Sequence, residues 1–355
     1  MLAIHHQSDT CRNRGHRRLQ ITAINEPPLV SVIALNYNSL KFIASCIESV
    51  QAQSYPAIEI IVIDNASTDD SVELAQSAIR GRSNARLIQN EHNLGFAGGM
   101  NVGAGCANGE LVMFLNADVV LGIDYVAQAV AALQNTDQKV GMIGGRISRW
   151  VDGQLTEELD AGPVMMRKRF SHTSSGSIDT QAFVFAPAGS CPLVRKEMLE
   201  DTKLASGDYY DSDYFMYSED TDLWFRAHLR GWKCLYVPKA VAWHVRAGSY
   251  AGKRRVHERP LPPQRWAMRN RWITMLKVLP VPLMLRLSPY LLLAELLTVG
   301  FFIVRSPRSL VAWGQAIGDF ISNLPATVKK RRHIQSQRTA EVKDLVKLFA
   351  GFWSL

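Results

Sequence analysis

Three aspartates lie at points of the chain where a ligand could reach them. Asp64 and Asp118 each end an apolar run, and Asp220 stands at the start of a predicted helix. In sheets of parallel strands the ligand crevice lies beyond the carboxyl ends of the strands, so Asp64 and Asp118 are placed to meet a ligand. Purely structural roles are possible as well, because Asp64 could close an Asx-turn and Asp118 could close a turn or cap a helix near Asp124.

These positions suit a substrate that carries a nucleoside diphosphate. Such a substrate needs a site for its base, a positive charge for its diphosphate and a group that takes a proton from the attacking nucleophile. Asp64 could hydrogen-bond a nucleobase or ribose, and Asp118 could hold Mg²⁺ or Mn²⁺, which take one or two protein carboxylates beside a phosphate. His244 could be a second metal ligand, although a lone histidine beside Trp243 is also typical of a packed residue.

Asp220 is the candidate general base, with Glu219 beside it. Acidic side chains in the first turn of a helix complement the helix dipole, and that would explain one of them. It does not explain three carboxylates between Glu219 and Asp222. One base suffices for a single displacement with inversion, whereas retention needs a second, nucleophilic carboxylate that the sequence does not single out.

Two common nucleotide-binding motifs are absent from the sequence. The turn after the first predicted strand is Asn36-Tyr37-Asn38-Ser39, which lacks the glycines of the dinucleotide-binding G-x-G-x-x-G turn. The P-loop pattern G-x-x-x-x-G-K-[ST] does not occur either. Because this turn has no cation to hold phosphates, a metal at Asp118 is the simpler way to neutralise a diphosphate.

Alternating strand and helix patterns position these residues. Each short apolar run is followed by an amphipathic stretch and then by another apolar run. This alternation predicts an α/β fold with a mostly parallel sheet and helices on both faces. The predicted strands cover 29–35, 58–63, 85–89 and 111–115, and the predicted helices cover 40–53, 69–79 and 101–107, the last after a glycine-rich loop at 93–99.

The pattern is less regular after Asp118. We expect a long loop or insertion over 148–181 that could shape an acceptor site, because this stretch is polar and contains glycine and serine. The other predicted elements are helices over 124–133 and 223–229, a helix entered after Arg195, and strands over 140–147 and 234–237. Regular structure resumes at 182–185, and the segment 241–244 closes the acidic region.

Composition bounds the class of protein. A chain of 355 residues with 47% hydrophobic and 20% charged residues is typical of a globular protein, not of a disordered or polytopic membrane protein. Five scattered cysteines without a C-x-x-C pair favour reduced thiols in the cytosol over a disulfide framework or a zinc site.

Positive charge and apolar runs coincide in the last third of the chain. Residues 246–355 carry 19 Lys and Arg against 5 Asp and Glu, whereas residues 29–245 carry 17 against 25. No stretch of about 20 uninterrupted apolar residues occurs, so we expect a helix between Tyr290 and Val304 that lies in the interface of an anionic membrane. This combination favours a membrane over nucleic acid as partner, and a basic helical subdomain packed on the α/β domain is the alternative.

The chain therefore divides into three predicted segments. Residues 1–28 form a flexible basic arm, residues 29–250 form the α/β domain, and residues 251–355 form a basic and apolar helical region that associates with a membrane.

Six motifs occur in order over residues 29–250. They are residues 32–39, 62–69, 93–101, 116–118 and 219–223, and His244 with Gly248-Ser249. Together they resemble the family 2 glycosyltransferases with a GT-A fold, most closely the rhamnosyltransferase-like branch.

The resemblance implies roles for individual residues. Asp64 would contact the nucleobase, and Asp118 would bind the metal and the diphosphate with His244 at the same place. Asp220 would be the base, beside Glu219. The further donor-binding positions that it implies are Asn36, Tyr37, Asn93, Gly95, Asn101 and Asn116. The usual D-x-D signature is Asn116-Ala117-Asp118 here, which leaves one charge fewer for Mg²⁺ or Mn²⁺.

The resemblance also implies a function. It is that of an inverting glycosyltransferase that moves a sugar, with rhamnose a candidate, from a nucleotide-sugar to a hydroxyl of a lipid-linked or polysaccharide acceptor. Its place would be the inner face of a bacterial cytoplasmic membrane, in cell-envelope glycan synthesis. Two alternatives remain: a sugar-nucleotide pyrophosphorylase, which would need a Gly/Arg/Lys-rich loop after the first strand, and a non-enzymatic membrane-bound scaffold with this fold.

Overall fold

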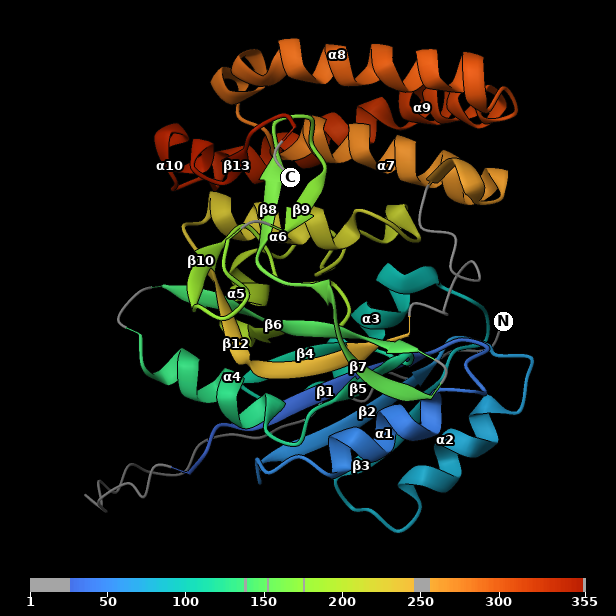
Figure 1. The fold of residues 1–355 in the computed structure, drawn as a ribbon, viewed down its shortest axis with the longest axis vertical. Coiled ribbons are helices and arrows are strands. Elements are labelled where there is room, and N and C mark those ends of the chain that lie inside the picture. The colour runs from blue at the N-terminus through green and yellow to red at the C-terminus, as the bar shows by residue number, and fades with distance from the viewer. Residues whose placement is uncertain (1–25, 137–138, 152, 175, 246–255, 354–355) are drawn as a thin grey trace, which may run out of the picture.

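The computed structural model describes residues 26–136, 139–151, 153–174, 176–245 and 256–353. Most of the predicted arm, the Gly248-Ser249 motif and the predicted boundary at residue 250 lie outside the described residues. Figure 1 shows a central sheet with helices on both faces, and a stack of long C-terminal helices at one end of the molecule.

A ten-stranded mixed sheet forms the centre. Its strands are β1 (Val30–Asn36), β2 (Ile58–Asp64), β3 (Ala85–Gln89), β4 (Leu111–Asn116), β5 (Val119–Leu121), β6 (Val140–Val151), β7 (Gln154–Ala161), β10 (Ala182–Val184), β11 (Leu193–Arg195) and β12 (Lys233–His244). They lie in the order β10-β12-β6-β11-β4-β1-β2-β3, with β5 paired to β12 and β7 to β6. The block β4-β1-β2-β3 and the pair β12-β6 are parallel, and β11 joins the two through antiparallel pairs.

Helices cover both faces of this sheet, as the alternation of the sequence predicts. They are α1 (Ile43–Gln51), α2 (Ser71–Ile79), α3 (Gly95–Cys106), α4 (Tyr125–Gln134), α5 (Lys196–Asp201) and α6 (Glu219–Leu229). Alternate residues of β1 enter two separate cores. Ile33 packs in the core that α3 and α6 cover, while Val32 and Ala34 pack in the core that α1, α2 and α4 cover.

The strand register places the candidate residues on one edge. Asn36 at the end of β1 lies opposite Asp64 at the end of β2. On the other side of β1, Leu35 lies opposite Asn116 at the end of β4. Because these parallel strands end level with one another, their last residues share one edge of the sheet with Asp118.

Several predicted boundaries are wrong. The stretch 148–181, predicted as a loop, contains the end of β6, all of β7, and the hairpin of β8 (Val164–Arg167) and β9 (His172–Ser174). Its polar residues alternate along strands whose outer face is exposed, which hides the strand pattern. Helix α3 begins at Gly95, inside the predicted glycine-rich loop, and β12 extends the predicted strand 234–237 without interruption to His244.

The C-terminal region is helical, as predicted. It consists of α7 (Leu261–Val278), α8 (Val281–Arg305), α9 (Ser309–Ser336), α10 (Val342–Val346) and the short strand β13 (Phe349–Ala350). Helix α7 packs along α9 and against α6, and β13 pairs with β8 in a small second sheet, β13-β8-β9. In Figure 1 the β8-β9 hairpin reaches up to these helices, and α8 is the outermost layer.

Helix α8 is longer than predicted. The sequence favours a helix from Tyr290, whereas the helix begins at Val281 and runs through Pro289. Proline has no N–H to give the carbonyl four residues earlier. The Ser288 hydroxyl donates to that carbonyl, on Leu285, at 2.8 Å, so the acceptor stays satisfied and the helix continues.

The outer side of α8 is apolar and open. Leu285, Leu292, Leu296, Ile303 and Val304 are each at least 60% exposed. By length and composition α8 is able to cross a membrane, and it is the one helix of the described residues that meets this test. Only 11% of its apolar stretch is buried, which is unlike the core helix of a soluble protein.

Candidate active site

Two neighbouring cavities open beyond the carboxyl ends of β1, β2 and β4. The first has a volume of about 410 Å³ and is lined by Tyr37, Asn65, Asn93, Gly95, Phe96, Asp118, Phe215 and Trp266, among others. The second has a volume of about 330 Å³ and is lined by Asp160, His172, Gly189, Asp220 and His244, among others. Asn116 lines both cavities, so they meet at the end of β4.

An amide cluster shapes the wall of the first cavity. The Asn65 Nδ2 donates to Asn93 Oδ1 and to the Gly95 carbonyl, both at 2.9 Å, and the Gly95 N–H donates to Asn93 Oδ1 at 2.8 Å. Gly95 has φ +72°, and a Cβ there would lie 2.4 Å from the Phe215 carbonyl oxygen. Both the left-handed backbone and this close approach require glycine.

Asp64 is held by its own loop. Its Oδ1 accepts hydrogen bonds from Asn36 Nδ2 at 2.8 Å and from the Ser67 hydroxyl at 2.5 Å, and its Oδ2 accepts from the Ser67 N–H at 3.1 Å. Neither Asp64 nor Asn36 is among the residues that line the two cavities. These contacts correspond to the Asx-turn alternative, and the predicted nucleobase contact stays a prediction.

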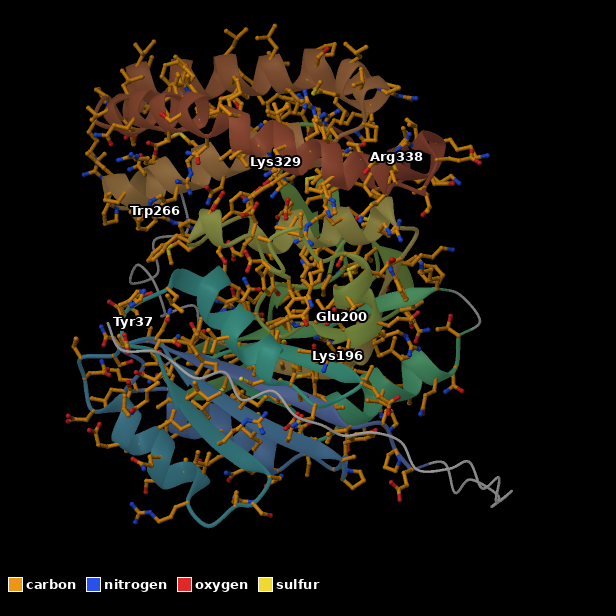
Figure 2. All side chains as sticks on the ribbon, turned by 180° about the vertical axis from the view of Figure 1, so that it is seen from behind. Tyr37, Lys196, Glu200, Trp266, Lys329 and Arg338 are labelled. Carbon is orange, nitrogen blue, oxygen red and sulfur yellow. The ribbon has the colours of Figure 1, made fainter. Side chains whose placement is uncertain are left out.

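Tyr37 and Trp266 face the first cavity from opposite layers. Tyr37 follows β1 and is 45% exposed, whereas Trp266 lies on α7. Figure 2 shows the two residues at the same edge of the molecule, one at the sheet and the other on the helix stack. The C-terminal helices thus form part of the candidate site.

Asp118 is paired with His244 at the point where the cavities meet. The His244 Nε2 lies 3.3 Å from Asp118 Oδ1, and its Nδ1 lies 3.3 Å from Asp160 Oδ2. Burial alone would lower the pKa of His244, but the hydrogen bonds and the charges of Asp118 and Asp160 outweigh it and raise that pKa to about 9. The imidazole is therefore positively charged at neutral pH between two carboxylates.

The donors around Asp118 fit a divalent cation that a phosphate group helps to hold. Asp118 offers carboxylate oxygen, His244 offers a ring nitrogen once deprotonated, and the buried Oδ1 of Asn116 has no hydrogen-bond partner in the described part of the chain. Mg²⁺ and Mn²⁺ accept such a set when phosphate oxygens complete it. Among the described residues, no group of three or more His, Cys, Asp or Glu side chains is arranged to hold a metal ion.

Asp220 lies in the second cavity, in the first turn of α6. Its Oδ1 accepts the N–H of Thr221 at 2.6 Å, and its Oδ2 points at Gly189, where a Cβ would be only 2.6 Å from that oxygen. Glu219 is buried and lines neither cavity. Burial, and then repulsion from Asp220 and Asp222, raises the pKa of Glu219 well above its ordinary value.

A constrained loop carries the chain into Asp220. Phe215, Tyr217 and Ser218 have φ of 62°, 70° and 66°, a region that side chains with a Cβ rarely adopt. The buried Asn270 of α7 holds the loop, because its Nδ2 lies 3.0, 2.8 and 2.9 Å from the carbonyl oxygens of residues 214, 216 and 217. The position of the candidate base thus depends on α7.

Asn101 links two segments and does not reach the cavities. Its Oδ1 accepts the N–H of Tyr210 at 2.9 Å, and its Nδ2 donates to the Tyr210 carbonyl at 2.8 Å. The donor-binding role of Asn101 stays a prediction.

The polar and aromatic residues that line the cavities and that the sequence does not single out include Asn65, Asp160, His172 and Trp266. Asn65 directly follows Asp64 in the motif over residues 62–69, and that motif is a signal for it. Asp160 and His172 lie in the stretch 148–181, which is predicted as a loop or insertion. Trp266 lies in a region whose charge and apolar runs pointed to a membrane.

Comparison with known proteins identifies this architecture. Residues 31–202 match the family model of glycosyl transferase family 2. The match includes β1 to β4 and the residues Asp64 and Asp118, and it ends before Asp220 and His244. The match thus covers slightly less than half of the 355 residues.

Two relatives of the chain are a bacterial glycosyltransferase and a bacterial polysaccharide synthase. Glycosyltransferase GlyG of Streptococcus pneumoniae is 26% identical over 53% of this chain and 64% of that protein. Poly-beta-1,6-N-acetyl-D-glucosamine synthase of Staphylococcus epidermidis is 26% identical over 75% of this chain and 60% of that protein. The chain thus spans less than two thirds of the length of these relatives.

Solved structures agree on the fold. S. aureus TarS 1-349 in complex with UDP-GlcNAc has a TM-score of 0.57 at 19% identity, over 87% of this chain and 90% of that chain. GalNAc-T7 with UDP, GalNAc and Mn²⁺ has a TM-score of 0.57 at 16% identity, over 71% of this chain and 48% of that chain. At such identities the likeness concerns the fold alone, and it extends in TarS to most of the chain.

Proposed function

We propose that this protein is an inverting glycosyltransferase that moves a sugar from a nucleotide-sugar to a hydroxyl of a lipid-linked or polysaccharide acceptor. The observation that carries the proposal is the junction of two cavities at Asn116, with Asp118 in one and Asp220 in the other. The first cavity takes the nucleotide and the second takes the acceptor. Rhamnose stays a candidate sugar beside those that the relatives' names mention.

The transfer is a single displacement. The acceptor hydroxyl oxygen attacks the anomeric carbon from the side of Asp220, and the bond from that carbon to the diphosphate oxygen breaks. The electron pair leaves with the nucleoside diphosphate, and the hydroxyl proton passes to Asp220 Oδ2. One carboxylate is enough for this inverting course.

Asp118 and His244 serve the leaving group. A divalent cation, Mg²⁺ or Mn²⁺, supplies positive charge to the departing diphosphate when it is bound. The Mn²⁺ in the GalNAc-T7 structure supports such a cofactor. Asp118 with His244 would hold it, and Asn116 would add a neutral amide oxygen where the usual signature has a carboxylate.

We place the protein on the inner face of a bacterial cytoplasmic membrane, in cell-envelope glycan synthesis. The open apolar side of α8 supports attachment to a membrane, and the polysaccharide synthase among the relatives supports the glycan product. Basic residues near the ends of α8, among them Arg286, Arg305 and Arg308, favour an anionic lipid surface.

The experiment tests the role of Asp220 with three variants. The donor is first chosen by thermal shift with UDP-GlcNAc, GDP-mannose and dTDP-rhamnose, and transfer is then measured with that donor. In Asp220→Asn we expect kcat to fall by about 10² to 10⁴, since the general base is lost, while the affinity for the donor is unchanged. Asp124→Asn, which alters an exposed carboxylate outside both cavities, is the matched control and keeps full activity.

Gly189→Ala examines the same carboxylate from its other side. A Cβ at residue 189 would lie 2.6 Å from Asp220 Oδ2, so the oxygen has to move. We expect kcat to fall at least about tenfold, because the base is misplaced. The affinity for the nucleotide should not change. Full activity in Asp220→Asn would overturn the assignment of the base.

A further inference from the structure

A third cavity lies away from the two that meet at Asn116. It has a volume of about 560 Å³ and lies between α7, α8 and the segment after β13, within the range of small-molecule sites, about 300–1,000 Å³. Met268 and Phe302 in its wall are buried, and Leu297 and Phe301 are partly exposed at 47% and 39%. Its walls are thus largely apolar and continue into the open side of α8.

Two arginines bring positive charge to this apolar cavity. Arg169, at the turn of the β8-β9 hairpin, donates to the Ser171 hydroxyl at 3.2 Å and lies over the ring of Trp353 at 5.6 Å. Among the described residues no carboxylate pairs with Arg169. Arg271 of α7 donates to the Arg169 carbonyl at 2.7 Å and is paired with Glu295 of α8. The charge of Arg169 is therefore left for an anion.

The surroundings of Arg169 agree with this excess of positive charge. Burial, and then repulsion from Arg167 and Arg271, lowers the pKa of its guanidinium from the ordinary value. An anion beside these arginines would relieve the repulsion. An apolar cavity with one free cation at its edge suits a molecule with an apolar chain and an anionic group.

The β8-β9 hairpin connects this cavity with that of Asp220. Arg169 and Ser171 at its turn line the third cavity, and His172 to Ser174 of its second strand line the second cavity. His172 Nε2 lies 3.1 Å from the hydroxyl of Thr221, the residue after Asp220. The third cavity and the cavity of the candidate base are therefore joined by the turn and the second strand of one hairpin.

We propose that the third cavity binds the lipid anchor of the acceptor, with Arg169 on a phosphate group of that lipid and the apolar chain against α7 and α8. The proposal rests on the proposed function for the presence of a glycan acceptor. The acceptor is thereby named as a lipid phosphate, and the apolar chain of this lipid is assigned to a cavity that is separate from the two at Asn116.

Binding is tested without any transfer reaction. The full chain is titrated by calorimetry with dodecyl phosphate below its micelle concentration, and with inorganic phosphate and dodecyl glucoside as partial probes. We expect saturable binding of one dodecyl phosphate, and at least tenfold weaker binding of both partial probes. We expect Arg169→Gln to weaken the affinity for dodecyl phosphate at least tenfold. Arg286→Gln, which removes an exposed arginine of α8 outside the cavity, should change this affinity less than twofold.

A second pair of variants separates the cavity from the open side of α8. Ala294→Trp fills the cavity, and Leu296→Trp puts the same ring on the exposed side of the helix. Loss of binding in the first variant alone supports the proposal. Equal effects of the two, equal effects of Arg169→Gln and Arg286→Gln, or binding of dodecyl glucoside as tight as that of dodecyl phosphate would overturn it.

Transfer kinetics keep this proposal distinct from the proposed function. We expect Arg169→Gln to raise KM at least tenfold for an acceptor sugar linked to a lipid phosphate. KM and kcat for the same sugar as a methyl glycoside should not change. Transfer that is lost for both acceptors in Asp220→Asn but unaffected for both in Arg169→Gln would leave the glycosyltransferase in place and remove the lipid site.

Discussion

Two histidines of this protein differ in charge because of their surroundings. His244 lies between Asp118 and Asp160, and its pKa is raised to about 9. His228 of α6 has its Nε2 2.5 Å from the Phe185 carbonyl oxygen, and burial lowers its pKa to about 4. At neutral pH, His244 is thus a cation in the site, whereas His228 is a neutral donor in the core.

The neutral state of His228 predicts a loss of stability in acid. A histidine in the unfolded chain takes up a proton below about pH 6.5, but the buried ring does not until about pH 4. The free energy of unfolding therefore falls as the pH drops between these values, by up to about 3 kcal/mol for this group. Above pH 6.5 the group contributes no pH dependence.

His228→Gln measures this contribution, since the glutamine amide can still donate to Phe185. Urea unfolding at pH 7.5, 6.0, 5.0 and 4.5 should show a shallower acid loss in the variant than in the parent. His333→Gln, at a partly exposed histidine of α9, serves as the control with the parental slope. Parallel curves for His228→Gln and the parent would contradict the prediction.

At the residue scale, the sequence predicts the positions of the candidate carboxylates better than it predicts the residues that surround them. Asp118 and Asp220 line the cavities because one follows a buried strand and the other starts a helix, and both positions can be seen as patterns. Asp160 and Trp266 come from segments whose local pattern contains no sign of a site. The pairing of Asp64 with Ser67 is a local turn. The sequence predicts this turn as one alternative but does not distinguish it from a contact with the nucleobase.

At the scale of elements, α7 is the helix that joins the candidate site to the C-terminal region. Its Lys277 is fully buried and pairs with Asp211 and, at 2.8 Å, with Asp222 of α6. Burial would raise the pKa of Asp211, but Lys277 and Lys330 lower it below its ordinary value. These pairs fix α6, and with it Asp220, against α7.

Lys277→Met should destabilise the protein by about 3–5 kcal/mol. The variant leaves two buried carboxylates without their shared cation, a cost in that range for a broken buried pair. Chemical unfolding followed by tryptophan fluorescence gives the difference. Lys343→Met is the matched control, because Lys343 pairs with Glu341 at side-chain exposures of 72% and 67%, and such a pair contributes about 0–1 kcal/mol.

A double variant distinguishes charge from packing. Lys277→Met combined with Asp222→Asn should recover part of the lost stability, because it removes one of the two carboxylates that lose Lys277. The other carboxylate, Asp211, keeps its contact with Lys330. If the double variant is as unstable as the sum of the single ones, the charge explanation is wrong.

Element types follow from the sequence where the periodicity is strong. Strands β1, β2 and β4 are buried on both faces and appear as largely apolar runs, so they are predicted within two residues, as is the partly exposed β3. The strands β7 to β9 have polar, partly exposed residues and were missed. The predicted helix is shorter than α3 because glycines that pack closely against β1 look like a loop in the sequence: a Cβ at Gly99 would lie 2.5 Å from the side chain of Leu35.

At the scale of the whole molecule, charge and apolar surface are separated. The sheet domain carries an excess of acidic residues, while the last third of the chain carries an excess of basic residues. Helix α8 lies outermost, and Glu295, the carboxylate within it, points back to Arg271 of α7. The outer side of the helix is therefore apolar from Leu292 to Val304.

Leu296→Glu should release the protein from anionic vesicles. We expect the affinity for vesicles with 30% phosphatidylglycerol to fall about tenfold or more, because a buried leucine contributes about 1.5–3 kcal/mol and a carboxylate is repelled by the surface. Ile123→Glu is the control: both residues are 62% exposed, but Ile123 lies on the sheet domain. Co-sedimentation that falls equally in both variants would contradict an α8-mediated contact.

The clamp of Asn270 on the loop before Asp220 has a consequence for the order of events during synthesis. At about 5–20 residues per second, β1 to β4 leave the ribosome well before α7, and the loop has no Asn270 to hold it in the meantime. The nascent domain can form its sheet early, yet the candidate base is fixed and Trp266 closes the first cavity only when α7 arrives. Helix α8 emerges immediately afterwards, so the chain would complete its candidate site at about the time at which its apolar outer helix appears.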